Sequence, residues 1–130
     1  MIYRFLVTTS EETRYLPFGP IIFDIEQIDT KNSFNINDGV FTVPESGLYL
    51  FTFNGYVNTN IYGVVYVYVN GNRIKYFYDY EGTGKYGREL TFFVSLELQQ
   101  YDELYLDNGY ASSLYVTDDH PMTFLGTLLK

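Results

Sequence analysis

The side chains best placed to bind a ligand are tyrosines that alternate with apolar residues. Tyr66 and Tyr68 alternate with valines, and Tyr105 lies between two leucines. In β-strands these tyrosines would lie on the face opposite the apolar residues. Aromatic rings near Asp, Asn or Arg suit a ligand with one apolar and one polar face, such as a sugar. The alternative is that these tyrosines are only good strand residues with hydroxyls in water.

A second candidate is a local concentration of positive charge in an acidic chain. The chain has 8 Lys and Arg against 16 Asp and Glu, a formal net charge of −8. Around one predicted hairpin and the loop after it lie four cations, Arg73, Lys75, Lys85 and Arg88. An anionic ligand needs a local basic site on an acidic protein. We therefore expect an acidic or sialylated sugar, if one is bound, to bind there.

Groups for catalysis are few. His120 is the only histidine, and it lies beside two aspartates and a proline in a predicted loop. No cysteine is present, so a thiolate nucleophile and a disulfide framework are both excluded. The adjacent carboxylates of the chain are loop-borne, whereas a buried acid–base pair needs apolar surroundings. We predict that the protein is not an enzyme.

Composition and length indicate the class of fold. Residues 1–130 are expected to form one domain, large enough to bury a core. Aromatic residues make up 20% of the chain, with 15 Tyr and 11 Phe, and favour an all-β fold. The acidic balance argues against nucleic acid and anionic membrane surfaces. No apolar run reaches the ~20 residues of a membrane span, so no membrane insertion is expected, and residues 1–7 are too short for a signal peptide.

Short strands separated by turn signals are predicted along the whole chain. The turn signals recur every 8 to 12 residues or so, which is typical of a sandwich or jelly roll. Asn70-Gly71 is the strongest hairpin signal. In the strand after it, an inward Ile74 would bring Tyr76 and Tyr78 inward and leave Phe77 outward. The predicted strands cover residues 3–8, 21–28, 34–36, 40–43, 47 onward, 62–69, 73–80, 88–98, 103–107, 114–116 and 123–129.

The strand that begins at Gly47 is apolar on both faces. Tyr49 and Phe51 lie on one face, and Leu48 and Leu50 lie on the other. A small domain has one core to offer, so the second face is most simply covered by another chain.

The spacing of the aromatic residues resembles the signature of the C1q globular domain, of the C1q/tumour necrosis factor superfamily. The resemblance covers about residues 3–129. Its signature positions are Phe23, Asp29, Phe34, Phe41, Gly47, Tyr49, Phe51 and Phe53, followed by Asn70-Gly71, Leu96, Leu98, Phe124, Gly126 and Leu128. One departure is Tyr101-Asp102, where the family has Gly-Asp, so we expect that turn to be remodelled.

The resemblance implies a ten-stranded jelly-roll sandwich that assembles as a homotrimer. It implies that Tyr49, Phe51, Phe53, Leu96, Leu98, Phe124 and Leu128 face the core. It also implies a trimer interface formed by Leu48, Leu50, Phe93, Leu125 and Leu129. Because several family members bind calcium near the trimer apex, a calcium site is considered at Asp107, Asn108, Asp118 and Asp119, although solvated acidic loops would explain the same residues.

The leading functional hypothesis is a secreted, trimeric recognition module of innate immunity. Its ligand would be a carbohydrate, bound as lectin-like members of the family bind theirs, with three sites adding avidity. The alternatives are a trimerising, structural head of a collagen-like or matrix protein, and a cytokine-like ligand for a receptor. The sequence does not separate them.

Overall fold

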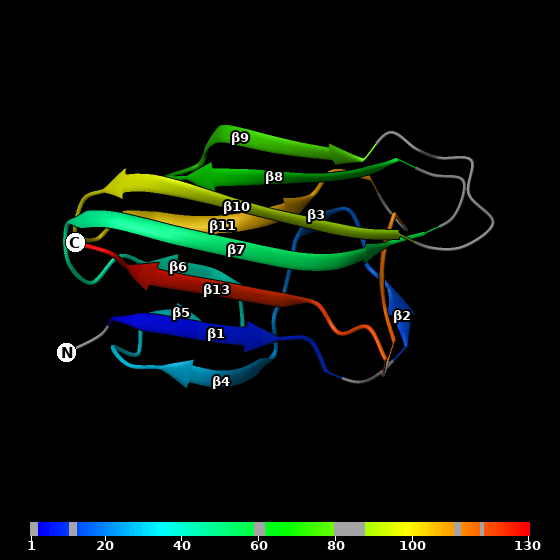
Figure 1. The fold of residues 1–130 in the computed structure, drawn as a ribbon, viewed down its shortest axis with the longest axis horizontal. Helices are drawn as coiled ribbons and strands as arrows, with labels where there is room; N and C mark the ends of the chain where they lie inside the picture. Colours follow the sequence, from blue (N-terminus) through cyan, green and yellow to red (C-terminus); the bar gives the residue numbers. More distant parts are fainter. Residues whose placement is uncertain (1–2, 11–12, 59–61, 80–87, 111–112, 118) are drawn as a thin grey trace.

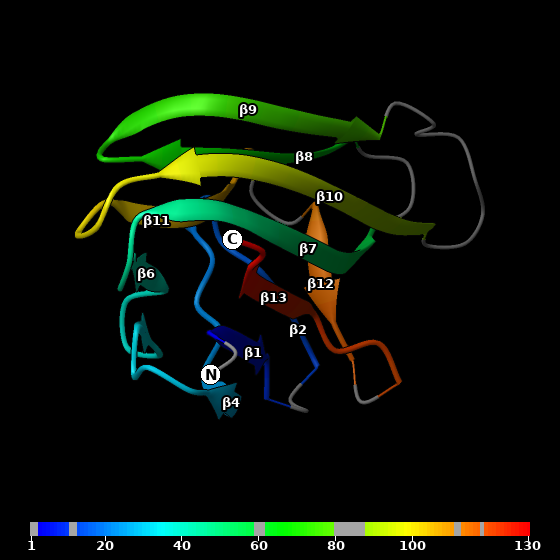
Figure 2. The ribbon, with the colours of Figure 1, turned by 60° about the vertical axis from the view of Figure 1, so that its left-hand side comes forward.

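The chain folds into two β-sheets that pack face to face (Figures 1 and 2). The structure is a computed structural model, and it describes residues 3–10, 13–58, 62–79, 88–110, 113–117 and 119–130. Within these ranges all paired strands are antiparallel. No helix long and apolar enough to cross a membrane occurs in them.

The seven-stranded sheet is built around its longest strands. Its order is β2–β12–β7–β13–β1–β4, and β10 pairs along the other side of β7. The strands are β1 (Arg4–Thr8), β2 (Arg14–Tyr15), β4 (Ile25–Asp29), β7 (Gly47–Val57), β10 (Arg88–Leu98), β12 (Leu114–Val116) and β13 (Thr123–Leu128).

The six-stranded sheet has the order β5–β6–β11–β8–β9, and β3 pairs with β11. Its strands are β3 (Gly19–Pro20), β5 (Phe34–Asn35), β6 (Val40–Thr42), β8 (Gly63–Val69), β9 (Asn72–Asp79) and β11 (Glu103–Asn108). In the described ranges, ten strands of both sheets have three or more residues, and β2, β3 and β5 have two each. The all-β sandwich predicted from the sequence is confirmed.

Only part of the strand predicted at 21–28 forms. Ile25–Asp29 is a strand, while Ile21 and Phe23 lie buried in an extended segment outside it. The backbone N–H of Ile21 donates to the carbonyl of Leu106, at 2.9 Å. This segment therefore crosses from one sheet to the other, and its apolar side chains fill the core between them.

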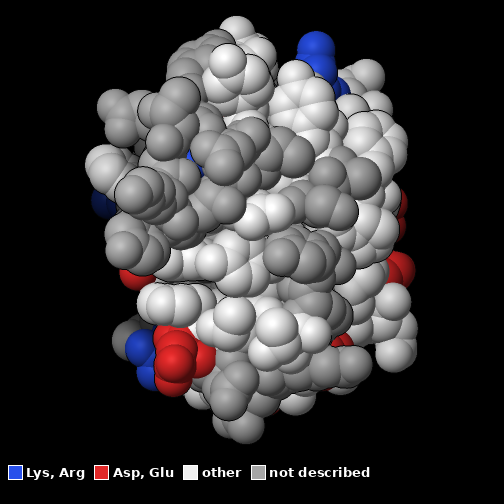
Figure 3. All heavy atoms as spheres, turned by 90° about the vertical axis from the view of Figure 1, so that its right-hand side faces the viewer, with Lys and Arg blue, Asp and Glu red and all other residues white. Residues whose placement is uncertain are grey.

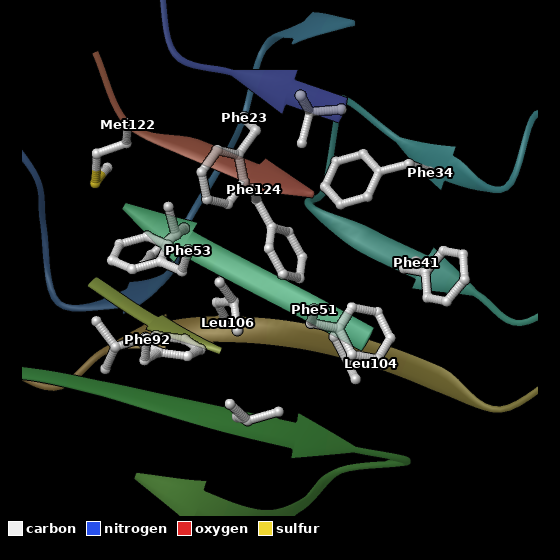
Figure 4. Close-up of a cluster of buried hydrophobic side chains, with 14 of the residues drawn as sticks. Phe23, Phe34, Phe41, Phe51, Phe53, Phe92, Leu104, Leu106, Met122 and Phe124 are labelled. Carbon is white, nitrogen blue, oxygen red and sulfur yellow. The ribbon is translucent and has the colours of Figure 1, made fainter. Parts of the chain in front are cut away.

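The core is a continuous cluster of phenylalanine rings between the sheets (Figure 4). Phe5 lies at its centre, within about 5 Å of the ring centroids of Phe34, Phe41 and Phe124. Burying so many rings supplies the main driving force for folding, and offset or edge contacts add to it. All seven residues predicted to face the core do so, either fully buried or partly buried and packed against it: Tyr49, Phe51, Phe53, Leu96, Leu98, Phe124 and Leu128.

Gly126 is a signature position with a steric explanation. A Cβ atom at this position would lie 2.3 Å from the ring of Phe5 and 3.0 Å from that of Phe51. The missing side chain thus lets two core rings approach the backbone of β13. Any larger residue would have to displace them.

Asp29, another signature position, organises the turn between β4 and β5. Its carboxylate accepts hydrogen bonds from the backbone N–H of Ser33 at 3.0 Å and of Phe34 at 2.8 Å, and from the Ser33 hydroxyl at 3.2 Å. These bonds satisfy donors that no strand pairing reaches. The turn therefore positions Phe34 so that its side chain is buried in the core.

Two turns at one end of the sandwich are linked by Asn70. Asn70 and Gly71 have φ values of 52° and 81°, as a two-residue type I′ hairpin requires. The Asn70 amide also donates to the carboxylate of Asp102 at 2.9 Å and accepts from the N–H of Glu103 at 2.9 Å. The hairpin signal is confirmed, and its asparagine also fixes the turn between β10 and β11.

The turn expected to be remodelled keeps a backbone of the glycine type. Tyr101 has a φ of 75°, a region that glycine adopts readily and tyrosine rarely. Its N–H donates to the carbonyl of Val43 at 2.8 Å, and its side chain is 74% exposed. The Tyr101-Asp102 turn therefore keeps the conformation that glycine would adopt at position 101, and the tyrosine adds backbone strain there.

Strand β9 faces opposite to the orientation considered from its sequence. Phe77 packs against the core, whereas Ile74, Tyr76 and Tyr78 are exposed. The arrangement considered from the sequence, with Ile74 inward and Phe77 outward, is therefore not the one that forms.

A β-bulge explains the reversal. The register of β8 and β9 shifts between Val67, which lies opposite Lys75, and Tyr68, which lies opposite Arg73. Ile74 has no partner in this register and is the extra residue of the bulge. Because side chains alternate with a period of two, one extra residue turns over every side chain beyond it.

Candidate functional site

The outward face of the six-stranded sheet carries the three predicted tyrosines together. Tyr68 on β8 lies opposite Tyr105 on β11, and their rings are parallel with centroids 5.0 Å apart. Tyr66 meets Tyr68 edge to face at 6.4 Å. All three side chains are half-buried. We call these residues the tyrosine face.

Arg73 joins the tyrosine face because of the bulge in β9. Its guanidinium carbon lies 4.6 Å from the centroid of the Tyr66 ring, a cation–π contact. Its register partner is Tyr68, and partners in an antiparallel pair share one face of the sheet.

Neither of the other two described cations, Lys75 and Arg88, joins Arg73. Lys75 lies opposite Val67, whose side chain is in the core, so it projects from the other face of β9. Arg88 lies on β10 and forms an ion pair with Asp79 at 2.8 Å, with both side chains 17% exposed. Lys85 lies outside the described residues. Figure 3 shows the end of the sandwich where β10 begins, and the blue Lys and Arg atoms visible there do not form one continuous patch.

Asp107 is a member of this site that the sequence did not associate with the tyrosines. It lies opposite Tyr66, and it shares a face of β11 with Tyr105 two residues earlier. Burial raises the pKa of the Asp107 carboxyl above its ordinary value. Burial, followed by the charges of Asp107 and Tyr68, raises the pKa of the Tyr105 hydroxyl. The i, i+2 spacing of Tyr105 and Asp107 was the signal that could have found it.

The predicted calcium ligands that the structure describes, Asp107, Asn108 and Asp119, lie in or next to different sheets, and one of them is already bonded within the protein. Asn108 is fully buried, and its side-chain oxygen accepts from the Ser113 hydroxyl at 3.0 Å while its amide donates to the Pro17 carbonyl at 3.0 Å. Asp107 is on the six-stranded sheet, whereas Asp119 follows β12 of the other sheet. Asp118 lies outside the described residues. In the ranges that the structure describes, no three His, Cys, Asp or Glu side chains come together to hold a metal, and the calcium site stays a prediction.

The outward face of the seven-stranded sheet carries a row of mostly apolar residues, interrupted by Thr52. Ile28 lies opposite Leu6, Leu6 opposite Leu125, Leu125 opposite Thr52, and Thr52 opposite Phe93. This row crosses five strands, and Phe93 at its end is 74% exposed. We call the following set the apolar face: Leu6, Ile28, Leu48, Leu50, Phe93, Leu125 and Leu129.

The apolar face contains all five residues predicted for a trimer interface. Leu48, Leu50 and Leu125 are partly exposed, and Leu129 is 53% exposed. The sequence did not predict Leu6 and Ile28 as part of this face, because their strands are short. Strand β1 pairs with β13 on one side and with β4 on the other, and this pairing brings both residues into the row.

Comparison with known proteins decides the family. The C1q domain profile matches residues 4–129. The chain belongs to the C1q domain family. The matched segment includes both the tyrosine face and the apolar face, so both lie within the C1q domain of this chain.

Two curated relatives support this placement. The C1q domain is 34% identical over 110 residues to complement C1q tumor necrosis factor-related protein 3 of Mus musculus and of Homo sapiens. The match covers 84% of this chain and 44% of each relative, so the chain spans less than half the length of these relatives.

Solved structures share the fold at low sequence identity. The globular domain of zebrafish complement 1qA superposes with a TM-score of 0.81 and 20% identity, covering 98% of both chains. Murine APRIL has a TM-score of 0.74 and 8% identity, covering 98% of this chain and all of that one. Eiger TNF from S. frugiperda has a TM-score of 0.72 and 11% identity, covering 99% and 93%. The fold is that of the C1q/TNF superfamily.

Membership of the C1q domain family also indicates whether the protein is an enzyme. The C1q/TNF family is non-enzymatic, in agreement with the prediction from the sequence. His120 lies flat on the ring of Tyr56, with centroids 4.3 Å apart and an interplanar angle of 10°. In this C1q domain the histidine is thus a packing residue at the end of the seven-stranded sheet.

Proposed function

We propose that this C1q domain is a secreted homotrimeric recognition module that binds a carbohydrate. The observation that carries the proposal is the difference between its two outward faces. One sheet presents a row of aliphatic and aromatic residues, and the other presents tyrosines flanked by a cation and a carboxylate.

The apolar face supports self-association. An exposed apolar surface across five strands costs free energy in water and is commonly covered by another chain. A three-fold contact joins unlike parts of neighbouring copies, so Phe93 at one end of the row can meet apolar residues near the other end. Fold and family membership support a trimer in the same way.

The tyrosine face supports sugar binding. Aromatic rings stack on the C–H faces of sugar rings, while nearby charged groups bond to hydroxyls. Each such contact is weak, and three sites on one trimer would add avidity. A role in innate immune recognition follows from this proposal.

A glycan array probed with the recombinant protein, with and without calcium, tests the function. We expect binding to at least one sugar class and three copies in light scattering. If no sugar is bound under either condition, carbohydrate recognition is wrong. If binding requires calcium, the calcium prediction gains its first support.

A trimerising head of a longer protein is the second candidate. It is favoured by the length of the named relatives, since the match covers 44% of each. Collagen-like Gly-x-y repeats encoded upstream in the gene would favour this role. A cytokine-like role is a further alternative, tested by binding to cells that carry candidate receptors.

A further inference from the structure

The tyrosine face combines a hydrogen-bond donor and an acceptor around one ring. Arg73 lies over Tyr66 at 4.6 Å, and Asp107 lies opposite Tyr66 in the register. In the part of the chain that the structure describes, the two charges form no ion pair with each other. Both therefore keep hydrogen-bonding capacity for a ligand above the ring.

The charge of this face does not favour an anionic ligand. Lys75 projects from the other side of β9, and Arg88 is paired with Asp79. Arg73 alone, among the described cations predicted for the site, reaches the tyrosines. A half-buried carboxylate beside it would repel the acid group of a sialylated sugar, since like charges in a partly desolvated site repel strongly.

We propose that the tyrosine face binds neutral hexoses, with Asp107 accepting hydrogen bonds from adjacent sugar hydroxyls and the tyrosine rings contacting the apolar side of the sugar. This inference rests on the proposed function and names its ligand class. It replaces the acidic sugar expected from the sequence with an uncharged one.

Each group of the site has a defined part in this binding. The Asp107 carboxylate has two oxygens, so it can accept from two neighbouring hydroxyls at once. Arg73 donates to a ring or hydroxyl oxygen from above Tyr66. The Tyr105 hydroxyl is protonated at neutral pH, as tyrosines ordinarily are, and can donate as well.

Binding of methyl α-mannopyranoside, methyl β-galactopyranoside and sialyllactose by the trimer tests the inference. The variants are Asp107→Asn and Arg73→Gln, and Glu26→Gln on the other sheet is the matched control. Urea unfolding checks that each variant is folded. We expect Asp107→Asn to weaken binding of a neutral glycoside by about ten- to a hundredfold, the usual loss for a hydrogen bond to a charged group.

The outcomes separate this inference from the proposed function. Loss of neutral glycoside binding in Asp107→Asn, with Glu26→Gln unchanged, supports it. Unchanged binding in Asp107→Asn, or binding of sialyllactose alone, overturns the inference and leaves carbohydrate recognition standing. Failure to bind any sugar on a full array overturns both.

Discussion

The rings of Phe77 and Phe92 lie parallel, with centroids 3.9 Å apart and 1° between their planes. The contact joins β9 of the six-stranded sheet to β10 of the seven-stranded sheet. Beside it, Arg88 on β10 is paired with Asp79 on β9 at 2.8 Å. Together these contacts close one open side of the sandwich.

Phe77→Ala should therefore destabilise the fold. Phe77 is half-buried, so we expect a loss of about 2 kcal/mol in the free energy of unfolding, less than the ~3–5 kcal/mol of a fully buried Phe. Urea unfolding measures it. The control is Tyr76→Ala, one residue earlier and 52% exposed, with an expected change within about 0.5 kcal/mol. Equal losses of unfolding free energy in the two variants would contradict a stabilising role for the Phe77–Phe92 contact.

Leu125→Asp should break the proposed trimer. Leu125 lies in the middle of the apolar row, and a carboxylate buried there without a partner is strongly destabilising to an interface. Light scattering should show single copies instead of three. Tyr76→Asp, on the other sheet, should leave the trimer intact. A Leu125→Asp variant that remains at three copies would refute this interface.

Tyr101→Gly should stabilise the protein by about 1 kcal/mol. Tyr101 has a φ of 75°, and glycine removes the steric cost of that conformation. The comparison is Tyr110→Gly, since Tyr110 is also exposed but has no positive φ, and no gain is expected there. Thermal unfolding of both variants decides the matter, and a gain at both positions would exclude this explanation.

Asp29→Ala should cost about 1–3 kcal/mol, because three hydrogen bonds to its carboxylate are lost and buried donors remain. Asp29→Asn retains one acceptor oxygen and should lose less. Denaturant unfolding of the two variants gives the comparison. If alanine and asparagine cost the same, the carboxylate does not organise the turn.

The effect of Asp107 on stability should depend on pH. Because its pKa is raised in the folded state, the folded protein holds this proton more tightly than the unfolded chain. The stability that Asp107 contributes through this proton is fully present below the ordinary Asp pKa. It is lost as the pH rises through the raised pKa of the folded state. Asp107→Asn should thus be more stable than the original protein at pH 7, and the difference should shrink at about pH 3.5. A difference independent of pH would contradict this.

Much of the fold could be predicted from local patterns in the sequence. The alternation of valine and tyrosine in β8 and the Asn70-Gly71 turn predicted a hairpin with tyrosines outward, and the family signature predicted the core phenylalanines. The five predicted residues of the apolar face were also brought together by alternation.

What failed depended on register between distant segments. The bulge at Ile74 reverses β9, and no local pattern marks it. The sequence therefore left the face of Phe77 open and grouped Lys75 with Arg73. Asp107 was considered only as a possible calcium ligand, because its place beside Tyr66 depends on the pairing of β11 with β8. Asn108, its neighbour, is buried by a contact with residues more than ninety positions away.

The bulge also governs how this domain should be aligned with its relatives. Ile74 has no partner across the hairpin, so a relative lacking one residue here can keep Arg73 outward and Phe77 inward. The gap in such an alignment belongs at Ile74. Placed in the Asn70-Gly71 turn, the gap would misalign residues 72–74 and would compare Arg73 with a residue that faces the other side of the strand.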